Sequence, residues 1–431
     1  MNYEECREWL ENRRLTIGSV PGLDAVNELL GLLGRPDEQL TFIHIAGTNG
    51  KGTTGYLIES VLVNNNIRTG RFLSPAVIDE REIILVNGKM VYKTIWAEKL
   101  SDIIELVEAN NLKATAFEIE FVLSLLIFID KKCQLVILEC GMGGRLDATN
   151  VINKSLVDVI TSLSVDHRNF LGDTLEEISL HKFGIISSLS KNVVLAHQIK
   201  EVYEYFDIYI KNPEFKGINV VKAEKDKLNS TFVKVDERVV QILNYKNYVN
   251  LQLSLAGIYQ TENAITALEV VDVLINEGYK LKEDKIRKAF LQAVWPGRFE
   301  ILKTNHLYIL DGAHNMDAVE RLFENMSLYF TNRRLIYIMG MYKDKDYRDV
   351  VKFVAPKGKA IVTVSARDRK RCVEAFELGK TFSEYNPNVT AADSYTEALE
   401  IANLLADKND IILIFGSLSF LGEMRELILK K

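Results

Sequence analysis

The chain has 431 residues, of which 47% are hydrophobic and 26% are charged, a composition typical of a globular protein rather than a fibrous or disordered one. One hydrophobic core rarely organises a chain of this length, so we expect two domains. The formal net charge of -6 provides no basic surface for nucleic-acid phosphates, and we expect no nucleic-acid partner.

The N-terminal residues and the apolar runs indicate where the protein works. Acidic residues stand within the first five positions, and no apolar run reaches the roughly 18 residues needed to span a bilayer. We therefore expect a cytoplasmic protein with no membrane partner. The cysteines have neither paired zinc-type spacing nor the density of a disulfide scaffold, which predicts reduced thiols. They are Cys6, Cys133, Cys140 and Cys372.

Apolar runs typical of buried strands alternate along the chain with stretches typical of helices. This alternation predicts an α/β fold in which helices cover a parallel sheet. The turn signal WPGR at residues 295–298 indicates a joint, so we expect one domain over residues 1–296 and another over 297–431. The expected strands are Phe42–Ala46, Leu135–Glu139, Val157–Leu163, Asn192–Ala196, Leu307–Asp311, Arg334–Met339, Ala360–Ser365 and Ile411–Phe415.

Residues 47–54 read GTNGKGTT and follow the first expected strand, ahead of the amphipathic stretch Gly55–Asn64. Such a loop favours phosphate binding, because glycines let backbone N–H groups approach phosphate oxygens and a helix N-terminus favours negative charge. Lys51 can bring a cation to the β- and γ-phosphates, and Thr53 can offer its hydroxyl to Mg²⁺. The spacing is not that of the common GxxxxGK(S/T) loop, and a simple glycine-rich turn is the alternative.

A second polar segment, ECGMGGRLDATN at residues 139–150, directly follows an expected strand. An acid at the carboxyl end of a parallel strand points into the crevice where α/β proteins bind ligands. Glu139 is therefore a candidate Mg²⁺ ligand, because its hard oxygens suit a metal shared with ATP phosphates. Asp166-His167 follows another expected strand in the same manner, and an ordinary surface histidine is the alternative there.

Further motifs recur in order along nearly the whole chain. Besides residues 47–53, residues 139–150 and Asp166-His167, these motifs are Ser74-Pro75, Phe117-Glu118, Leu171-Gly172, Lys182 before Gly184-Ile185, Asn263-Ala264, Pro296-Gly297-Arg298, DGAHN at 311–315, GMYKDKD at 340–346 and Gly416-Ser417-Leu418. In this order and spacing, the chain resembles the folylpolyglutamate synthase and dihydrofolate synthase family of the Mur ligase superfamily.

The resemblance implies an N-terminal P-loop ATPase-like domain that binds ATP and the acid substrate. A smaller C-terminal Rossmann-like α/β domain would bind the amino acid, and the two domains would close over ATP. The ATP-binding residues implied are Asn49, Gly50, Lys51, Gly52, Thr53, Asn263, Arg298 and Asp311. The implied ligands of two Mg²⁺ ions are Ser74, Glu139, His167 and Lys182.

Lys182 matches the family lysine that is carbamylated by CO₂, a change that turns a cation into a carboxylate. The reaction needs a neutral amine, which burial or a neighbouring cation can supply by lowering the pKa of a lysine. An ordinary lysine on an expected helix Leu175–Ile185 is the alternative. The resemblance implies that Lys51, Glu139, His167 and Lys182 carry the catalysis.

The implied reaction joins L-glutamate to a folate, and in some members to dihydropteroate, through an acyl phosphate made from ATP. Phe117, Leu146 and Ala148 match positions that line the pterin pocket, although such apolar residues could equally belong to the core. The residues implied to meet glutamate are Arg298, His314 and Ser417. We expect the enzyme to act as a monomer.

Some residues near the implied acid site differ from the family pattern. Ala76 stands where the family usually has histidine, the loop from Pro75 to Glu80 is about two residues short, and Phe121 takes the place of a usual threonine. A Mur-type amide ligase that acts on a different carboxylate is therefore an alternative. A non-ligating ATP-binding switch is an alternative of another class.

Overall fold

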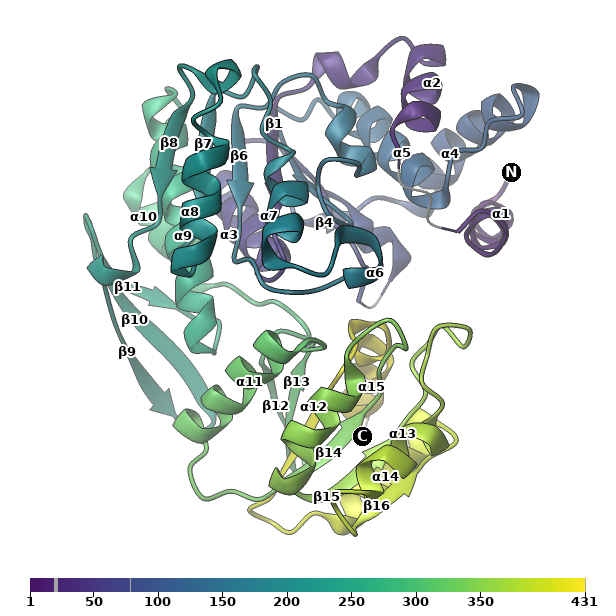
Figure 1. Cartoon of the computed structure of the whole chain (residues 1–431), viewed down its shortest axis with the longest axis vertical. Coiled ribbons are helices and arrows are strands. Elements are labelled where there is room, and N and C mark those ends of the chain that lie inside the picture. The colour runs from purple at the N-terminus through teal and green to yellow at the C-terminus, as the bar shows by residue number, and fades with distance from the viewer. Residues whose placement is uncertain (19–21, 78, 431) are drawn as a thin grey trace. The chain divides into compact units, whose positions relative to one another are not determined.

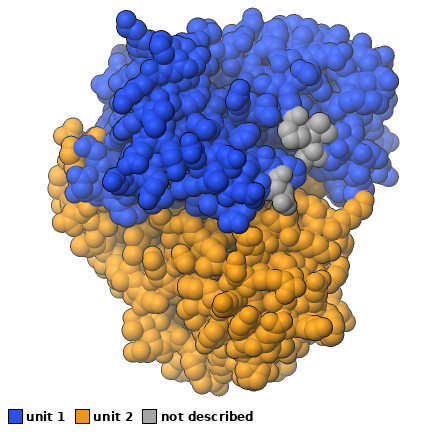
Figure 2. Space-filling view, in the orientation of Figure 1, with its two compact units in different colours: residues 1–74, 81–226, 262–289 blue, residues 75–80, 227–261, 290–431 orange. Residues whose placement is uncertain are grey.

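A computed structural model describes residues 1–18, 22–77 and 79–430 (Figure 1), and its elements form the α/β fold that the sequence predicts. The chain divides into two compact units (Figure 2). Unit 1 comprises residues 1–74, 81–226 and 262–289, and unit 2 comprises residues 75–80, 227–261 and 290–431. The units thus interleave along the sequence, and the single functional boundary at residue 296 stays a prediction.

Unit 1 is built on an eight-stranded sheet in the order β4-β3-β2-β5-β1-β6-β7-β8. The first strand, β1, pairs in parallel with β5 and β6, and all five of its residues are buried. A continuous apolar run is what a strand covered on both faces requires. The strands are β1 Phe42–Ala46, β2 Thr69–Phe72, β3 Ile84–Val86, β4 Lys89–Met90, β5 Leu135–Glu139, β6 Val157–Ile160, β7 Asn192–Leu195 and β8 Asn219–Lys222.

Helices of unit 1 flank this sheet, with α7 and α8 nearer the viewer than α3 in Figure 1. Capping boxes begin three of them, because the side chains of Asn2, Thr115 and Thr174 each accept a hydrogen bond from the backbone N–H of a glutamate three residues later. The helices are α1 Tyr3–Thr16, α2 Asp24–Leu32, α3 Lys51–Asn64, α4 Lys93–Ala109, α5 Ala116–Asp130, α6 Arg168–Leu171, α7 Leu175–Phe183, α8 Lys200–Tyr209, α9 Ile258–Asn276 and α10 Glu283–Leu291, the first turn of α9 and the end of α10 belonging to unit 2.

Unit 2 holds a six-stranded sheet in the order β12-β13-β17-β14-β15-β16, which is parallel except for β12, and a three-stranded antiparallel sheet β11-β10-β9. Its strands are β9 Leu228–Val235, β10 Arg238–Tyr245, β11 Tyr248–Leu253, β12 Glu300–Lys303, β13 Leu307–Asp311, β14 Leu335–Met339, β15 Gly358–Thr363, β16 Val389–Ala391 and β17 Ile411–Phe415. Its further helices are α11 Met316–Tyr329, α12 Tyr347–Val354, α13 Ala375–Ser383, α14 Tyr395–Leu405 and α15 Leu418–Lys430.

The strands β1, β5, β13 and β17 have the bounds that the sequence predicts. Strand β6 ends earlier than predicted, at Ile160, because the carbonyl oxygen of Ser162 instead accepts hydrogen bonds from the loop after β1. The four cysteines are free thiols, as predicted. Within the described ranges, no helix is both long enough and apolar enough to cross a membrane.

Candidate functional site

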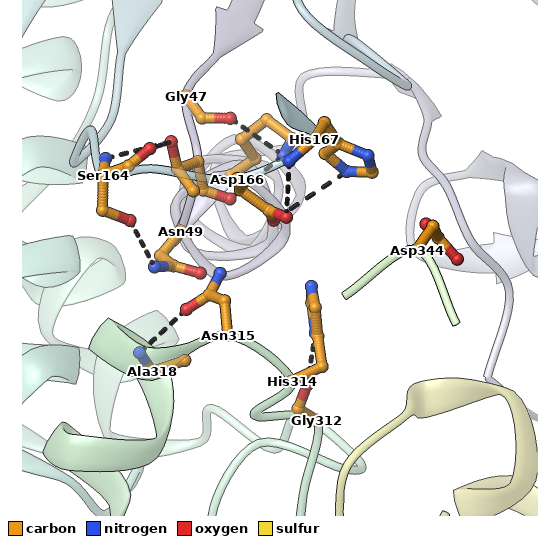
Figure 3. A network of polar contacts seen from close by, with 12 residues as sticks. Gly47, Asn49, Ser164, Asp166, His167, Gly312, His314, Asn315, Ala318 and Asp344 are labelled. Carbon is orange, nitrogen blue, oxygen red and sulfur yellow. Dashed lines mark hydrogen bonds and ion pairs between the residues drawn. The ribbon is translucent and has the colours of Figure 1, made fainter. Parts of the chain in front are cut away.

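The loop after β1 is held in place by the segment that follows β6. The backbone N–H groups of Thr48 and Asn49 donate to the carbonyl oxygen of Ser162, at 2.9 and 3.2 Å. The Thr48 hydroxyl donates to the Ser164 carbonyl at 2.9 Å, and the Asn49 amide reaches the Ser164 hydroxyl at 3.4 Å (Figure 3). Because its first residues are fixed in this way, the loop enters α3 in a defined position.

The N-terminus of α3 has the geometry of an anion site. The helix begins at Lys51, four residues before the sequence predicted, and no side chain caps its N-cap residue Gly50. The first backbone N–H groups of a helix have no partner within the helix, so they can serve a phosphate. A Cβ atom at Gly50 would stand 2.2 Å from the Asn263 side-chain oxygen, which shows that this predicted ATP residue lies directly over the loop.

Two lysine amines meet at one carbonyl oxygen of the loop. The Nζ atoms of Lys51 and Lys182 lie 3.1 and 3.0 Å from the Gly47 oxygen, and the Lys182 side chain is buried. Burial, and then the positive charge of Lys51, lower the pKa of Lys182 to about 7. Near neutral pH, a substantial fraction of Lys182 therefore carries a neutral amine.

The segment 139–150 packs closely against the helix that carries Lys182. A Cβ atom at Gly144 would stand 2.7 Å from the His181 carbonyl oxygen and 3.1 Å from the Lys182 Cα atom, so a side chain there would force the two segments apart. The Asn150 amide also donates to the Gly184 carbonyl oxygen at 3.0 Å. Glycine at this position thus fixes the distance between the loop and α7.

A chain of buried hydrogen bonds connects the loop at residues 139–150 to β1. Asp147 accepts hydrogen bonds from the Met142 N–H at 2.8 Å and from the Thr149 hydroxyl at 2.6 Å. The Thr149 oxygen lies 2.9 Å from the Nε2 atom of His44 in β1, and burial lowers the pKa of this histidine to about 3. A neutral imidazole that donates from Nε2 completes the chain, because the Thr149 hydrogen points to Asp147.

The side chains predicted to bind magnesium all belong to unit 1. Glu139 is buried at the end of β5, Ser74 follows β2, and His167 adopts a left-handed backbone with φ 54°. The backbone N–H of His167 donates to Asp166 Oδ1 at 2.8 Å, and its Nε2 atom lies 3.8 Å from Asp166 Oδ2. Across the described part of the chain, no three His, Cys, Asp or Glu side chains form a ready-made metal cluster.

In unit 2, a buried carboxylate organises the residues around the WPGR turn. Asp311, at the end of β13, accepts hydrogen bonds from the Tyr259 hydroxyl at 2.8 Å, the Phe299 N–H at 2.7 Å and the Ala313 N–H at 2.8 Å. Phe299 has a φ of 49°, which is uncommon for an aromatic residue, so Asp311 stabilises a strained turn. Arg298 lies beside this turn, because a Cβ atom at Gly312 would stand 2.3 Å from its guanidinium.

The other predicted residues of unit 2 lie at the ends of adjacent strands. Strands β13 and β17 pair in parallel, with Asp311 opposite Phe415. His314 follows β13, and its Nδ1 atom lies 2.8 Å from the Gly312 carbonyl oxygen (Figure 3). Ser417 follows β17 and contacts the Ser419 hydroxyl at 2.9 Å. The fold therefore brings Arg298, Asp311, His314 and Ser417 to one edge of the six-stranded sheet.

Both parts of the chain match domains of Mur ligases. Residues 45–271 match the Mur ligase middle domain, and residues 297–418 match the Mur ligase glutamate ligase domain. The dihydrofolate synthase/folylpolyglutamate synthase of Bacillus subtilis is 31% identical over 98% of this chain and 98% of its own length. The chain belongs to the folylpolyglutamate synthase/dihydrofolate synthase family of Mur ligases.

Solved structures of this family have the same fold. The Mycobacterium tuberculosis folylpolyglutamate synthase complexed with ADP and AMPPCP matches 99% of this chain and 98% of its own, with 26% identity and a TM-score of 0.87. Escherichia coli FolC in complex with DHPP and ADP matches 99% of this chain and 98% of its own, with 26% identity and a TM-score of 0.81. The resemblance seen in the sequence is thus confirmed over the full length.

The residues that the family resemblance assigns to the pterin pocket differ in burial. Phe117 is partly exposed among buried neighbours on α5, and Leu146 is 46% exposed. Both could contact a ligand, whereas Ala148 is buried and packs within the protein. Phe117 and Leu146 are thus the accessible members of this set, and the assignment of all three to the pterin pocket stays a prediction.

Two residues of the site that the sequence did not predict, Tyr259 and His44, hold other residues in place. Tyr259 donates to Asp311, and His44 supports the loop through Thr149. Tyr259 lies one helical turn before Asn263 on α9, a spacing that could have drawn attention to it. His44 stands in the middle of an apolar strand, where an isolated polar residue signals a buried partner.

Proposed function

We propose that this Mur ligase joins L-glutamate to a folate-type acid, and that it accepts both dihydropteroate and folates. A carboxylate oxygen of the acid attacks the γ-phosphorus of ATP, ADP leaves, and an acyl phosphate forms. The amine of glutamate then attacks the acyl carbon, and inorganic phosphate leaves as the amide bond forms. Both steps need phosphate charge to be neutralised and water to be kept away from the acyl phosphate.

One observation carries this proposal: the convergence of Lys51 and Lys182 on the Gly47 carbonyl at the start of α3. The uncapped helix N-terminus and the Lys51 amine can hold the phosphates of ATP, with Asn49, Gly50, Gly52, Thr53 and Asn263 around them. In unit 2, Arg298 and Asp311 are the further candidates for nucleotide contact, and Arg298, His314 and Ser417 for contact with glutamate.

The residues present fit a magnesium site shared with ATP. Mg²⁺ usually keeps several water ligands and binds through one or two carboxylates together with substrate phosphates, so the lack of a ready-made cluster among the described residues agrees with it. Glu139, His167 and the Ser74 hydroxyl would hold two such ions, with Lys182 as a carbamate. Bound Mg²⁺ would neutralise charge on the phosphate oxygens.

Lys182 also fits the carbamate that the family resemblance implies. Its neutral amine can attack CO₂ and lose one proton, which leaves an N-carboxylate in place of an ammonium. Burial and Lys51 supply the neutral form by lowering the pKa of Lys182 to about 7. A carboxylate at this position would attract both Lys51 and a metal ion, whereas an ammonium would repel both.

A substrate panel tests the proposed reaction. We expect phosphate release only when ATP, L-glutamate and either dihydropteroate or tetrahydrofolate are all present, with a product heavier by one glutamate in mass spectrometry. Release with an unrelated acid, and none with pterin acids, would favour a Mur ligase for another carboxylate. Nucleotide binding without turnover across the panel would favour an ATP-binding switch.

The carbamate has its own test. Lys182→Ala should be nearly inactive and partly restored by formate or acetate, which can supply the missing oxygens. Lys89→Ala, at an exposed position of β4, is a matched control that should respond to neither. Full activity of Lys182→Ala without added acid would overturn the carbamate.

A further inference from the structure

Three phenylalanines form a buried aromatic cluster behind the predicted pterin side of the acid site. Phe121 on α5 is fully buried and lies 5.7 Å from Phe72 at the end of β2, measured between ring centroids. Phe72 in turn lies 5.4 Å from Phe117, one helical turn before Phe121 on α5. Phe117 is the only partly exposed member of the three, so its ring separates the cluster from solvent.

The Phe117 ring is also confined at its tip. A Cβ atom at Gly141 would stand 2.7 Å from the Phe117 Cζ atom, so the ring already touches the loop that follows Glu139. Phe72 therefore supports the ring from the core, while Gly141 limits it on the loop side. Because well-packed interiors transmit small changes of volume, a change of the side chain at position 121 is expected to shift Phe72 and, through it, the Phe117 ring.

We propose that Phe121 determines specificity for the acid substrate by fixing, through Phe72, the position of the Phe117 ring against Gly141. A phenylalanine ring held in this way offers a rigid apolar surface on which a flat heteroaromatic ring can stack. Phe121 does not touch the substrate and is a positioning residue. This inference rests on the proposed function, because it takes Phe117 as part of the pterin wall.

A matched pair of variants on one helix tests the idea. Phe128 is fully buried on α5 and packs against Gly70 of β2, the same strand that ends in Phe72. Phe121→Leu and Phe128→Leu each remove one buried aromatic ring, so they should lower Tm to a similar extent. Only Phe121→Leu should move Phe117.

We expect Phe121→Leu to raise the KM for dihydropteroate by about tenfold, the usual scale for a misfit in an apolar pocket. Its KM values for ATP and glutamate should stay within about twofold of wild type, because only uniform binding of the acid is lost. Phe128→Leu should leave all three KM values unchanged. Gly141→Ala, at a residue outside the left-handed region, should displace the ring from the other side and raise the same KM.

A double-mutant cycle separates positioning from general loosening. The effect of Phe121→Leu on the KM for dihydropteroate should disappear when Phe117 is already leucine, because the two residues act through one ring. Equal KM changes in Phe121→Leu and Phe128→Leu, or additive effects in the cycle, would overturn the inference alone. Wild-type enzyme that turns over neither dihydropteroate nor folates would overturn the proposed function and the inference with it.

Discussion

In unit 1, two lysine amines converge on the Gly47 carbonyl oxygen, whereas in unit 2 one carboxylate, Asp311, collects three hydrogen-bond donors. The Gly47 carbonyl and Asp311 each lie at the carboxyl end of a parallel strand. The two groups differ in the bonding capacity that they leave for a ligand. Lysine amines each have three donors, so Lys51 can still serve a phosphate, while Asp311 has spent most of its acceptor capacity on the protein.

A charged side chain beside a strand end can therefore serve a ligand, as we expect for Lys51, or the fold, as Asp311 does. In unit 1, the loop is fixed by backbone bonds to Ser162, which leaves the lysine side chains for chemistry. In unit 2, Asp311 itself fixes the turn that carries Arg298. We therefore expect changes at Lys51 to affect activity alone, and changes at Asp311 to affect both activity and stability.

The largest effect is expected for Lys51→Ala, which removes the cation at the phosphate loop. We predict that kcat/KM falls by about a thousandfold or more, because charge neutralisation does most of the work in phosphoryl transfer. The melting temperature should stay close to that of wild type. Near wild-type ADP release would show that the Lys51 amine does not serve the phosphates of ATP.

Changes at Glu139 and His167 should act on the metal. We predict that Glu139→Gln and His167→Asn each raise the Mg²⁺ concentration needed for half-maximal rate by about 10- to 100-fold. Titration of activity with Mg²⁺ measures this directly. If both variants keep the wild-type dependence on Mg²⁺, these residues do not share the metal.

Unit 1 also contains a buried carboxylate, and its expected effect on stability depends on pH. Asp158 in β6 accepts a hydrogen bond from the Ser190 hydroxyl, and burial raises the pKa of its carboxyl to about 7. The folded state therefore holds the proton more tightly than the unfolded state, so this group's contribution to stability is present at low pH and is lost as pH rises from about 4 to about 7.

Asp158→Asn should remove that pH dependence and leave the protein more stable than wild type at pH 8. The difference should approach about 1.4 kcal/mol for each unit by which the pKa is raised. Urea unfolding at pH 5 and pH 8 measures it, provided that the amide keeps the Ser190 contact. A wild-type protein whose stability rises over this pH range, with no change in the variant, would contradict the assignment.

The smallest effect is expected for the hydrogen bonds of Asp311. We predict that Tyr259→Phe lowers the free energy of unfolding by about 1 kcal/mol, and Asp311→Asn by about 1–3 kcal/mol, because the amide opposes one of the three donors. Both should also raise the KM for ATP if Asp311 reaches the nucleotide. Unchanged stability in Asp311→Asn would show that the carboxylate is kept for a ligand after all.

The sequence predicts best where one physical cause dominates. Strands β1, β5, β13 and β17 are fully buried apolar runs ended by polar or glycine residues, and their bounds could be read directly. The sheet β9–β11 escaped prediction because polar and apolar residues mix in its strands, one face being partly exposed. Its pairing also depends on contacts that short-range patterns do not specify.

The candidate site shows the same limit. The phosphate loop could be predicted from its motif, because phosphate binding needs glycines and a cation at fixed spacing, whereas Lys182 was predicted only through the family resemblance. Tyr259 and His44 were missed, because each acts through a partner far away in the sequence. The burial of Ala148 and exposure of Leu146 likewise depend on tertiary packing and could not be decided from two neighbouring apolar residues.

The interleaving of the two units has a consequence for the order of synthesis. Val239 of β10 packs in one core cluster with Phe299 and Ile309, so strands made before residue 261 wait for partners that follow residue 290. Because residues 262–289 of unit 1 are synthesised in between, these partners leave the ribosome only after that segment. We predict that a fragment ending at residue 296 exposes apolar surface and binds a hydrophobic dye, whereas the full chain does not. A soluble fragment that binds no dye would show that β9–β11 do not need the later residues to cover their apolar surface.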